Sequence, residues 1–122
     1  MTIKVHSITR RKDDTFAKEM VTYFGLDSDT LESKSIAMKY DVIPPHTKTD
    51  EHAVAHPVES AIFMIKGKLK FYAEKKDGSI ESFEIKANDF IHVPPGEPHY
   101  AENETDQAAE ALVAIPSAKF TN

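Results

Sequence analysis

The sequence predicts a single small all-β domain, built as a closed barrel or a sandwich, and three observations support this fold class. Its 122 residues are enough for one substantial hydrophobic core but not for two. Beyond Leu31 the apolar residues alternate with polar ones, which is the period of a strand. Turn signals recur about every 8 to 12 residues, a spacing that favours a barrel or sandwich. We therefore expect one domain over residues 1–122, with the barrel over about residues 33–116.

The first barrel strand is predicted between residue 36 and the Pro44-Pro45 pair, because proline cannot donate to a sheet ladder. Every second residue of this strand is apolar and lies on one face, namely Ile36, Met38, Tyr40 and Val42. The pattern predicts a half-buried strand with this apolar face toward the core.

Six further strands are predicted on the same grounds. They cover about residues 54–65, 69–73, 80–85, 89–93, 99–102 and 109–115. Gly67 stops the first of these strands. The Asp77-Gly78 pair suits the positive backbone angles of a tight hairpin between the second and the third.

A short amphipathic helix is predicted over about residues 13–25, ahead of the barrel. Asp13 or Asp14 can cap its start, and Gly25 can end it. Three apolar residues between these ends have helical spacing, namely Phe16, Met20 and Phe24. We expect this apolar stripe to cover the barrel or a neighbouring subunit.

Charge and composition exclude several classes of partner and site. The formal net charge is -5, and the basic run at residues 10–12 is followed directly by two aspartates. Nucleic-acid binding needs a clustered basic face, so no such partner is expected. The absence of cysteine rules out disulfides and thiolate metal sites. No stretch approaches the roughly 20 apolar residues of a bilayer span, and the start lacks a signal-peptide core, so we expect no membrane partner and a cytoplasmic location.

The segment NDFIHVPPGEPHYAEN, which begins at Asn88, carries the most specific pattern of the chain. Pro94 ends a strand, and Gly96 permits a turn with positive φ. His99 is therefore predicted at the start of the returning strand, aimed by a rigid turn. Asn88 is compatible with a glycine-like position, because asparagine tolerates the left-handed region.

This segment resembles the second conserved motif of the cupin superfamily, G-x5-P-x-G-x2-H-x3-N. Pro94, Gly96, His99 and Asn103 match the motif, and Asn88 stands in place of its first glycine. The resemblance implies a single jelly-roll (RmlC-like) cupin barrel in which His99 binds a metal ion. A neutral imidazole is a common ligand of manganese, iron, nickel and zinc.

The first cupin motif, G-x5-H-x-H-x3,4-E-x6-G, is damaged in this chain. Its residue types are present between His46 and Gly67, but at other spacings. Counting back from Gly67 puts Ser60 in the glutamate position, His56 in the second histidine position and Val54 in the first. One ligand survives in this frame.

Counting forward, with His46 in the glycine slot, makes His52 the first histidine, Val54 the second and Glu59 the acid. Two ligands survive in this frame. The stretch ESAIFMIKG is similar to a variant found in some cupins, with seven residues between the glutamate and the glycine, and this favours Glu59. Val54 falls on a ligand position in both frames and cannot coordinate a metal.

Strand geometry limits which of these residues can share a metal. In a regular strand Glu59 faces away from His52 and His56, so it would need a bulge near Pro57 to turn inward. His52 and His56 lie about 13 Å apart in an extended strand, so both can bind one metal only if the strand is broken. The candidate metal ligands are His99 and His56, then Glu59 and His52, with His46 and His92 behind them.

Three other polar residues near these motifs receive no catalytic role. Tyr100 is expected on the opposite face of its strand from His99. Asp50 and Glu51 are interpreted as solvated loop charges, because nothing in the local spacing pairs them with a base.

The sequence leaves three functions open. The first is a barrel with one divalent metal ion per chain (manganese, iron, nickel or zinc) that acts on or binds a small organic molecule, as an oxygenase, isomerase or lyase. The second is a non-catalytic ligand-binding or sensing cupin that has lost its metal. The third is a metal-free, epimerase-like cupin that uses a histidine as general base. Fold does not select among them, so whether the protein is an enzyme stays open.

The resemblance also implies a homodimer. The leading segment, Thr2 to Ile8, carries apolar residues at Ile3 and Val5 and is predicted to be an edge strand, either exchanged between subunits or kept within its own.

Overall fold

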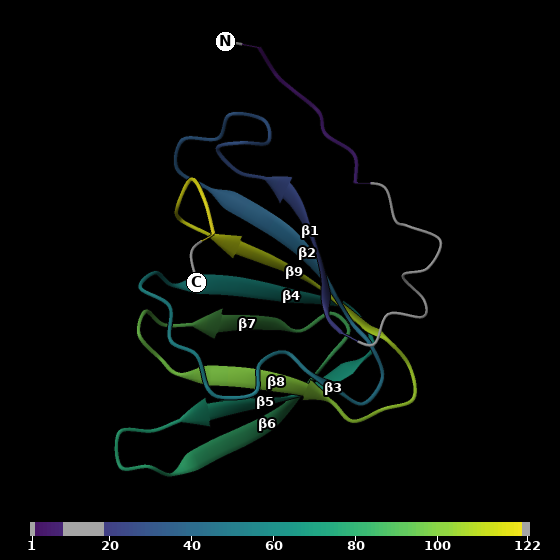
Figure 1. Cartoon of the computed structure of the whole chain (residues 1–122), viewed down its shortest axis with the longest axis vertical. Coiled ribbons are helices and arrows are strands. Elements are labelled where there is room, and N and C mark those ends of the chain that lie inside the picture. Colours follow the sequence, from purple (N-terminus) through teal and green to yellow (C-terminus); the bar gives the residue numbers. More distant parts are fainter. Residues whose placement is uncertain (1, 9–18, 121–122) are drawn as a thin grey trace.

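The computed structural model describes residues 2–8 and 19–120, and these residues form two antiparallel β-sheets and no helix (Figure 1). It follows that none of the described residues belongs to a helix long and apolar enough to cross a membrane. The strands are β1 (Val21–Leu26), β2 (Ala37–Ile43), β3 (Thr47–Lys48), β4 (Ser60–Lys66), β5 (Lys68–Glu74), β6 (Ile80–Lys86), β7 (Phe90–Val93), β8 (His99–Asn103) and β9 (Ala109–Ile115).

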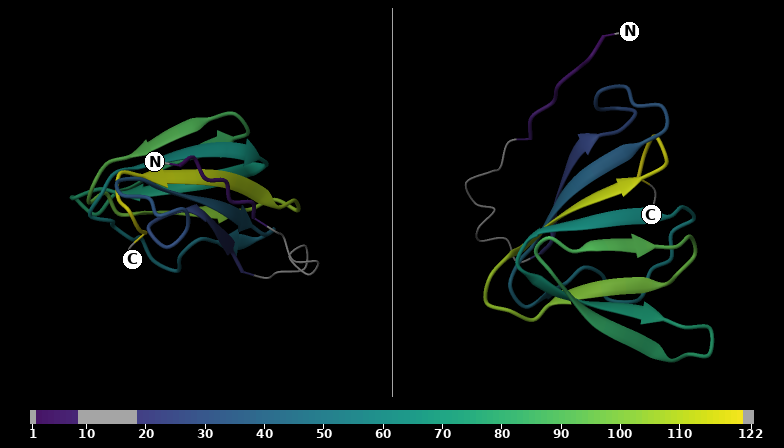
Figure 2. Two further views of the ribbon diagram at one scale, coloured as in Figure 1. Left: turned by 90° about the horizontal axis from the view of Figure 1, so that it is seen from above. Right: turned by 180° about the vertical axis from the view of Figure 1, so that it is seen from behind.

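The two sheets have the strand orders β1-β2-β9-β4-β7 and β3-β8-β5-β6. Strands that neighbour each other in space are mostly distant in sequence, as in β2 beside β9 and β5 beside β8. In the view from behind, the strands of the larger sheet lie above those of the smaller sheet (Figure 2). This arrangement confirms the predicted all-β class and is consistent with a jelly roll.

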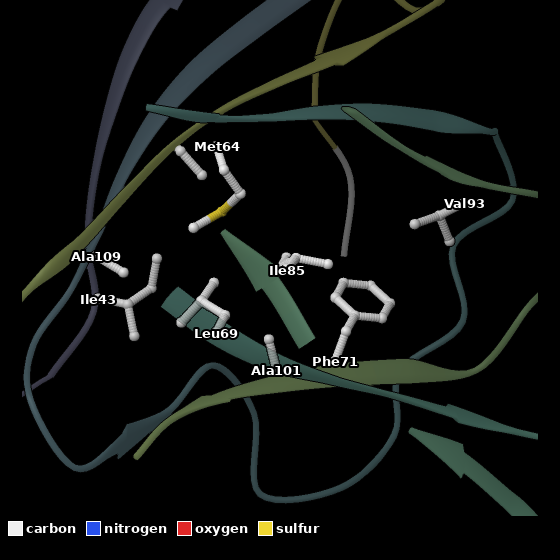
Figure 3. Close-up of a cluster of buried hydrophobic side chains, with 9 residues drawn as sticks. Ile43, Met64, Leu69, Phe71, Ile85, Val93, Ala101 and Ala109 are labelled. Carbon is white, nitrogen blue, oxygen red and sulfur yellow. The ribbon is translucent and has the colours of Figure 1, made fainter. Parts of the chain in front are cut away.

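The hydrophobic core lies between the sheets and draws on both of them. Figure 3 shows Met64 and Val93 of the larger sheet facing Leu69, Phe71 and Ala101 of the smaller one. Met64 is completely buried, and the other four residues are at most 5% exposed. Since a well-packed interior contributes most of the stabilising burial, these side chains hold the two sheets together.

The predicted helix is wrong where the structure describes it. Val21–Leu26 form the edge strand β1, paired antiparallel with β2. Residues 9–18, which contain the rest of the predicted helix, lie outside the described residues. The spacing of Met20 and Phe24 misled the prediction, because residues i and i+4 share a face in a strand as well as in a helix. The β-branched and aromatic residues between them favour the strand.

Strand β2 is present as predicted, but its faces are reversed. Lys39 and Asp41 point inward with Ile43, whereas Met38 lies on the outer face and is 36% exposed. Two polar side chains therefore enter the interior at positions where an apolar face was expected. The alternation of apolar and polar residues predicts a strand, but it does not determine which of the two faces of the strand lines the interior.

Strand β3, at Thr47–Lys48, was not predicted. The other strands agree with the prediction, except at two places. The run predicted from residue 54 is irregular at first, with an isolated bridge at Val54, and β4 begins only at Ser60. Residues 2–8 form no strand, and Figure 1 shows this segment extending away from the sheets. The hairpin between β5 and β6 is confirmed: Gly78 has φ +86°, and the Ser79 amide donates to Asp77 Oδ1 at 2.9 Å.

Candidate ligand pocket

A cavity of about 350 Å³ opens between the two sheets next to the core. Its walls come from β1, β2, β4 and β9 on one side and from β5, β6 and β8 on the other. Most of the lining side chains are apolar, and the few polar ones include His56, His99, Ser60, Lys39 and Asp41. This combination of an apolar wall with a few polar groups is typical of small-molecule sites.

A rigid turn directs His99 into this cavity from the start of β8. Gly96 has φ +74° and Asn88 has φ +76°, so both glycine positions of the motif adopt the left-handed conformation. The asparagine therefore does fill the glycine position, as predicted. The backbone of His99 exchanges two hydrogen bonds with that of Val54, at 2.9 and 3.0 Å. His99 is thus held at the seam between the turn and the irregular segment before β4.

Two contacts orient the His99 ring. Its Nδ1 lies 2.8 Å from the carbonyl oxygen of Glu97. Since a carbonyl can only accept, Nδ1 carries the proton and Nε2 carries the lone pair. The ring also stacks on Phe71 with a centroid distance of 5.5 Å and an interplanar angle of 8°. An imidazole with a fixed tautomer can accept a proton or bind a Lewis acid through Nε2.

His56 lies beside His99 although it comes from a different segment. The two ring centroids are 5.6 Å apart, in an edge-to-face arrangement, and both residues line the cavity. The carbonyl of His56 accepts a hydrogen bond of 2.8 Å from the Gly96 amide, which ties its segment to the turn before β8. The structure thus brings together the first two candidate ligands.

Glu59 does not join this pair. Its Oε1 lies 3.1 Å from Nε2 of His92, and the two side chains are 56% and 62% exposed. In the ladder between β4 and β7, His92 is paired with Ala61, whereas the cavity is lined by Ser60 and Ile62. Glu59 therefore follows the strand alternation that turns it away from the cavity. The register irregularity of β4 falls between Met64 and Lys66, beyond the point where it could reverse Glu59.

His52 and His46 also lie outside the cavity wall. His52 is exposed in the irregular segment before β4. His46 has φ +54°, which fits the glycine slot of the forward frame, and its Nε2 lies 2.7 Å from Asp106 Oδ1 at the surface. The backbone thus follows the forward frame, yet the histidine that reaches the cavity is His56.

Sequence reasoning missed the polar group at the other side of the cavity. Thr22 donates to Asp41 Oδ1 at 2.7 Å, and Lys39 Nζ lies 3.4 Å from Asp41 Oδ2. Asp41 is only 6% exposed. The sequence analysis did not single out these two residues, because charges at alternate positions of a strand usually mark a solvated face. Of the loop residues, Asp50 lines the cavity although it is exposed, whereas Tyr100 stacks on Tyr72 outside it.

The donor set does not fit a metal ion held only by protein ligands. Within residues 2–8 and 19–120, no group of three or more histidine and acidic side chains lies close enough to hold a metal ion. Catalytic zinc sites use three protein ligands and structural zinc sites use four, whereas His56 and His99 supply two. No reaction step is therefore derived through a metal.

The fold and the cavity define a class: a small double-sheet barrel with a cavity between its sheets. The chain belongs to the Cupin_2 family of cupin domains, whose family model matches residues 40–115. This confirms the resemblance of its second motif. The sequence matches no curated protein.

Solved structures of oxalate decarboxylase from Bacillus subtilis resemble the chain. One comes from a study of the Mn(II) centres of that enzyme and has a TM-score of 0.76. Two others, from studies of its substrate binding mode and of its proton-coupled electron transfer, have TM-scores of 0.75 and 0.76. In each case the identity is 25%, with 86% of this chain and 28% of the enzyme chain covered. The chain thus spans little more than a quarter of that enzyme.

Proposed function

We propose that this cupin binds a small organic molecule between its sheets, with His56 and His99 as the polar end of the site. The observation that carries the proposal is the imidazole pair, with centroids 5.6 Å apart, on the wall of a cavity of about 350 Å³. Both histidines line a mostly apolar cavity. A few polar groups on such a wall fix the orientation of a bound small molecule.

The tautomer of His99 supports a more specific role in proton transfer. The Glu97 carbonyl fixes the proton on Nδ1, so Nε2 is the basic nitrogen. A group with this orientation can accept a proton from a bound hydroxyl or from a carbon acid. This is the metal-free, general-base function among the alternatives.

A metal-dependent function is the second candidate, as an oxygenase, isomerase or lyase. It is supported by the two adjacent imidazoles and by the Mn(II) centres of the similar oxalate decarboxylase. Such a metal would need further ligands from water or from the organic molecule, because two imidazoles fall short of the usual protein set. The decarboxylase activity itself belongs to a much longer chain.

Ligand binding is tested by adding a library of small organic molecules to isotopically labelled protein and following the imidazole NMR signals. We expect a binder to shift the signals of His56 and His99 and to leave that of His52 unchanged. His99→Ala should weaken its binding by at least about tenfold, which corresponds to the loss of one good hydrogen bond. His52→Ala, the matched control, should bind normally. A binder that perturbs only the surface histidines would contradict the proposal.

The metal candidate is tested by elemental analysis of untagged protein before and after chelation. Binding of manganese, iron, nickel or zinc near one ion per chain, lost in His99→Ala but kept in His52→Ala, would favour it. Metal below about 0.2 per chain, with no uptake on re-addition, would exclude a tightly held ion, since structural sites bind zinc by about 10 to 16 kcal/mol.

The homodimer stays a prediction. Ile3 and Val5 of the leading segment are 95% and 87% exposed, which leaves apolar surface that a second subunit would cover. Light scattering on the full chain measures the mass directly, and a monomeric mass at working concentrations would contradict it.

A further inference from the structure

The larger sheet lines the cavity with apolar side chains on both sides of Lys39, which pairs in register with Phe24 and with Val113. Val113 and Ile62 face the cavity from adjacent strands of the larger sheet, where they are register partners. Phe24 and Phe120 line it further along, with ring centroids 6.0 Å apart. The body of a molecule bound here would exchange water for apolar contact, which stabilises it by roughly 25 cal/mol per Å².

The one cation among the described lining residues is already neutralised. Among the wall residues that the structure describes, Lys39 is the only lysine or arginine, and its Nζ lies 3.4 Å from the carboxylate of Asp41. The same ammonium lies 5.2 Å from the ring centroid of Phe120. Its positive charge is thus shared between an internal carboxylate and an aromatic face, and little of it is left to attract an anion.

A carboxylate entering this cavity would meet unfavourable electrostatics. Asp41 and Asp50 are the acidic residues of the described wall, so its carboxylates outnumber its one ammonium group. Removing a carboxylate from water into apolar surroundings costs several kcal/mol unless it is paired. A dianion such as oxalate would bear this cost twice, in a site with no uncommitted cation on the described wall.

The C-terminal segment is attached to the rest of the structure next to the end of the cavity that Phe24 and Phe120 line. The Ser28 amide donates to the Ala118 carbonyl at 2.6 Å, and Lys119 Nζ lies 2.8 Å from Asp29 Oδ2. The hydrogen bond to Asp29 raises the pKa of Lys119. These contacts hold Phe120 over the end of the cavity that is lined by Phe24.

From these observations we infer that the ligand is an uncharged, mostly apolar molecule with one hydroxyl group, and not a small dicarboxylate. This inference rests on the proposed function. The hydrocarbon body lies against Phe24, Val113 and Phe120, and the polar group reaches the imidazole pair. The charged pair of Lys39 and Asp41 selects against anions, because it leaves no uncommitted positive charge.

The test uses three probes on the full-length, chelated protein at pH 7. 4-Ethylphenol is neutral at this pH, 4-ethylbenzoate has a similar body with one negative charge, and oxalate is a dianion without an apolar body. Backbone amide shifts are followed in a labelled sample, and affinities come from the titrations. We expect 4-ethylphenol to bind at least about tenfold more tightly than 4-ethylbenzoate, and oxalate to give no shifts in the cavity wall.

Two variants examine the physical cause. Asp41→Asn retains an acceptor for Thr22 and removes the charge that neutralises Lys39. It should improve 4-ethylbenzoate binding by about tenfold or more, and so lower the ratio of 4-ethylphenol affinity to 4-ethylbenzoate affinity. Phe120→Ala should weaken 4-ethylphenol by about fivefold, since it removes an aromatic wall. Phe90→Ala, which removes an aromatic that is 81% exposed, is the matched control and should bind normally.

The outcomes separate the inference from the proposed function. If 4-ethylbenzoate or oxalate binds more tightly than 4-ethylphenol to the unmodified protein, the inferred ligand class is overturned while the pocket stands. If Asp41→Asn folds, by its thermal midpoint, and does not improve 4-ethylbenzoate binding, the assigned role of the ion pair is overturned. If no probe perturbs the cavity wall, both the inference and the proposed pocket fail. The expected ranking, together with the gain in Asp41→Asn, supports both.

Discussion

Two segments supply the cavity histidines, and they are held in different ways. The turn before β8 is held by its backbone conformation, since Asn88 and Gly96 adopt positive φ. The amide and the carbonyl of His99 both form hydrogen bonds with the backbone of Val54. The segment before β4 is irregular, with one isolated bridge, and it delivers His56 to the cavity while His52 stays at the surface. The glycine and proline residues of the second motif determine the backbone conformation of its turn. The sequence of the irregular segment does not determine which of its histidine side chains points into the cavity.

Two glycines, Gly67 at the end of the first motif and Gly96 within the second, also differ in their surroundings. A Cβ on Gly67 would lie 2.9 Å from Ala109 Cα and 3.0 Å from the Ala108 carbonyl oxygen. A Cβ on Gly96 would have no neighbour within 4 Å. Both residues have positive φ, so a side chain at either position would strain the backbone. Only a side chain at Gly67 would also clash with neighbouring atoms.

The largest expected effect follows from this difference. Gly67→Ala should lower the free energy of unfolding by about 3 kcal/mol, as the sum of left-handed strain and a backbone clash. Gly96→Ala should cost only about 1 kcal/mol, because strain acts alone. Urea denaturation followed by circular dichroism measures both. Equal losses in the two variants would show that β9 moves away from Gly67 at little cost.

Asn103, at the end of the second motif, tests how much the hydrogen bonds of a buried side chain stabilise the end of β8. The residue is completely buried, and its amide group donates to the carbonyls of Ile43 and Gln107 at 3.0 and 2.8 Å. Its Oδ1 accepts from the amide and the hydroxyl of Thr105. Asn103→Ala should therefore lower stability by about 2 kcal/mol, because buried partners lose their hydrogen bonds.

Thr105→Val is the matched control for Asn103. It removes only the hydroxyl contacts at the surface end of the same network, and we expect a loss of about 0.5 kcal/mol. Denaturation midpoints at equal slope compare the two variants. A larger loss of stability in Thr105→Val than in Asn103→Ala would mean that the Thr105 hydroxyl stabilises this loop more than the buried amide of Asn103 does.

Most of the fold was predictable because local signals and tertiary demands agree. The Asp77-Gly78 hairpin and the strands from β5 to β9 combine alternation with turn residues of defined backbone conformation. The prediction failed at Val21–Leu26, where a spacing of four residues fits two periods. It failed again on β2, where Lys39 and Asp41 face a cavity.

The candidate site was predictable only in part, and for a related reason. His99 follows from the turn that precedes it, and His56 was one of several histidines in a damaged motif. That His56 and not His52 meets His99 depends on the path of an irregular segment, which hydrogen bonds from Val54 to His99 and from Gly96 to the His56 carbonyl hold in place. The Lys39 and Asp41 pair has no sequence signature, because two charges at alternate positions usually mark a solvated face.

The stability contributions of the two segments should also differ. His99→Ala removes the stacking on Phe71 and the Nδ1 hydrogen bond, so we expect a loss of about 1 to 2 kcal/mol. His52→Ala removes an exposed ring and should change stability by less than about 0.5 kcal/mol. Thermal and urea denaturation of both variants provide the comparison. A loss in His52→Ala that equals that of His99→Ala would mean that the irregular segment is as tightly held as the turn.

The smallest effect is expected at Glu59, and it tests the direction of that side chain. The pair with His92 is exposed, so Glu59→Gln should change stability by less than about 0.5 kcal/mol. Because Glu59 lies on the outer face, the variant should also keep the metal content and the 4-ethylphenol affinity of the unmodified protein. His92→Gln removes the other partner and should give the same result. A clear drop in metal content in Glu59→Gln but not in His92→Gln would mean that the segment before β4 also adopts a conformation with Glu59 turned inward, because only an inward carboxylate could act on the cavity without its surface partner.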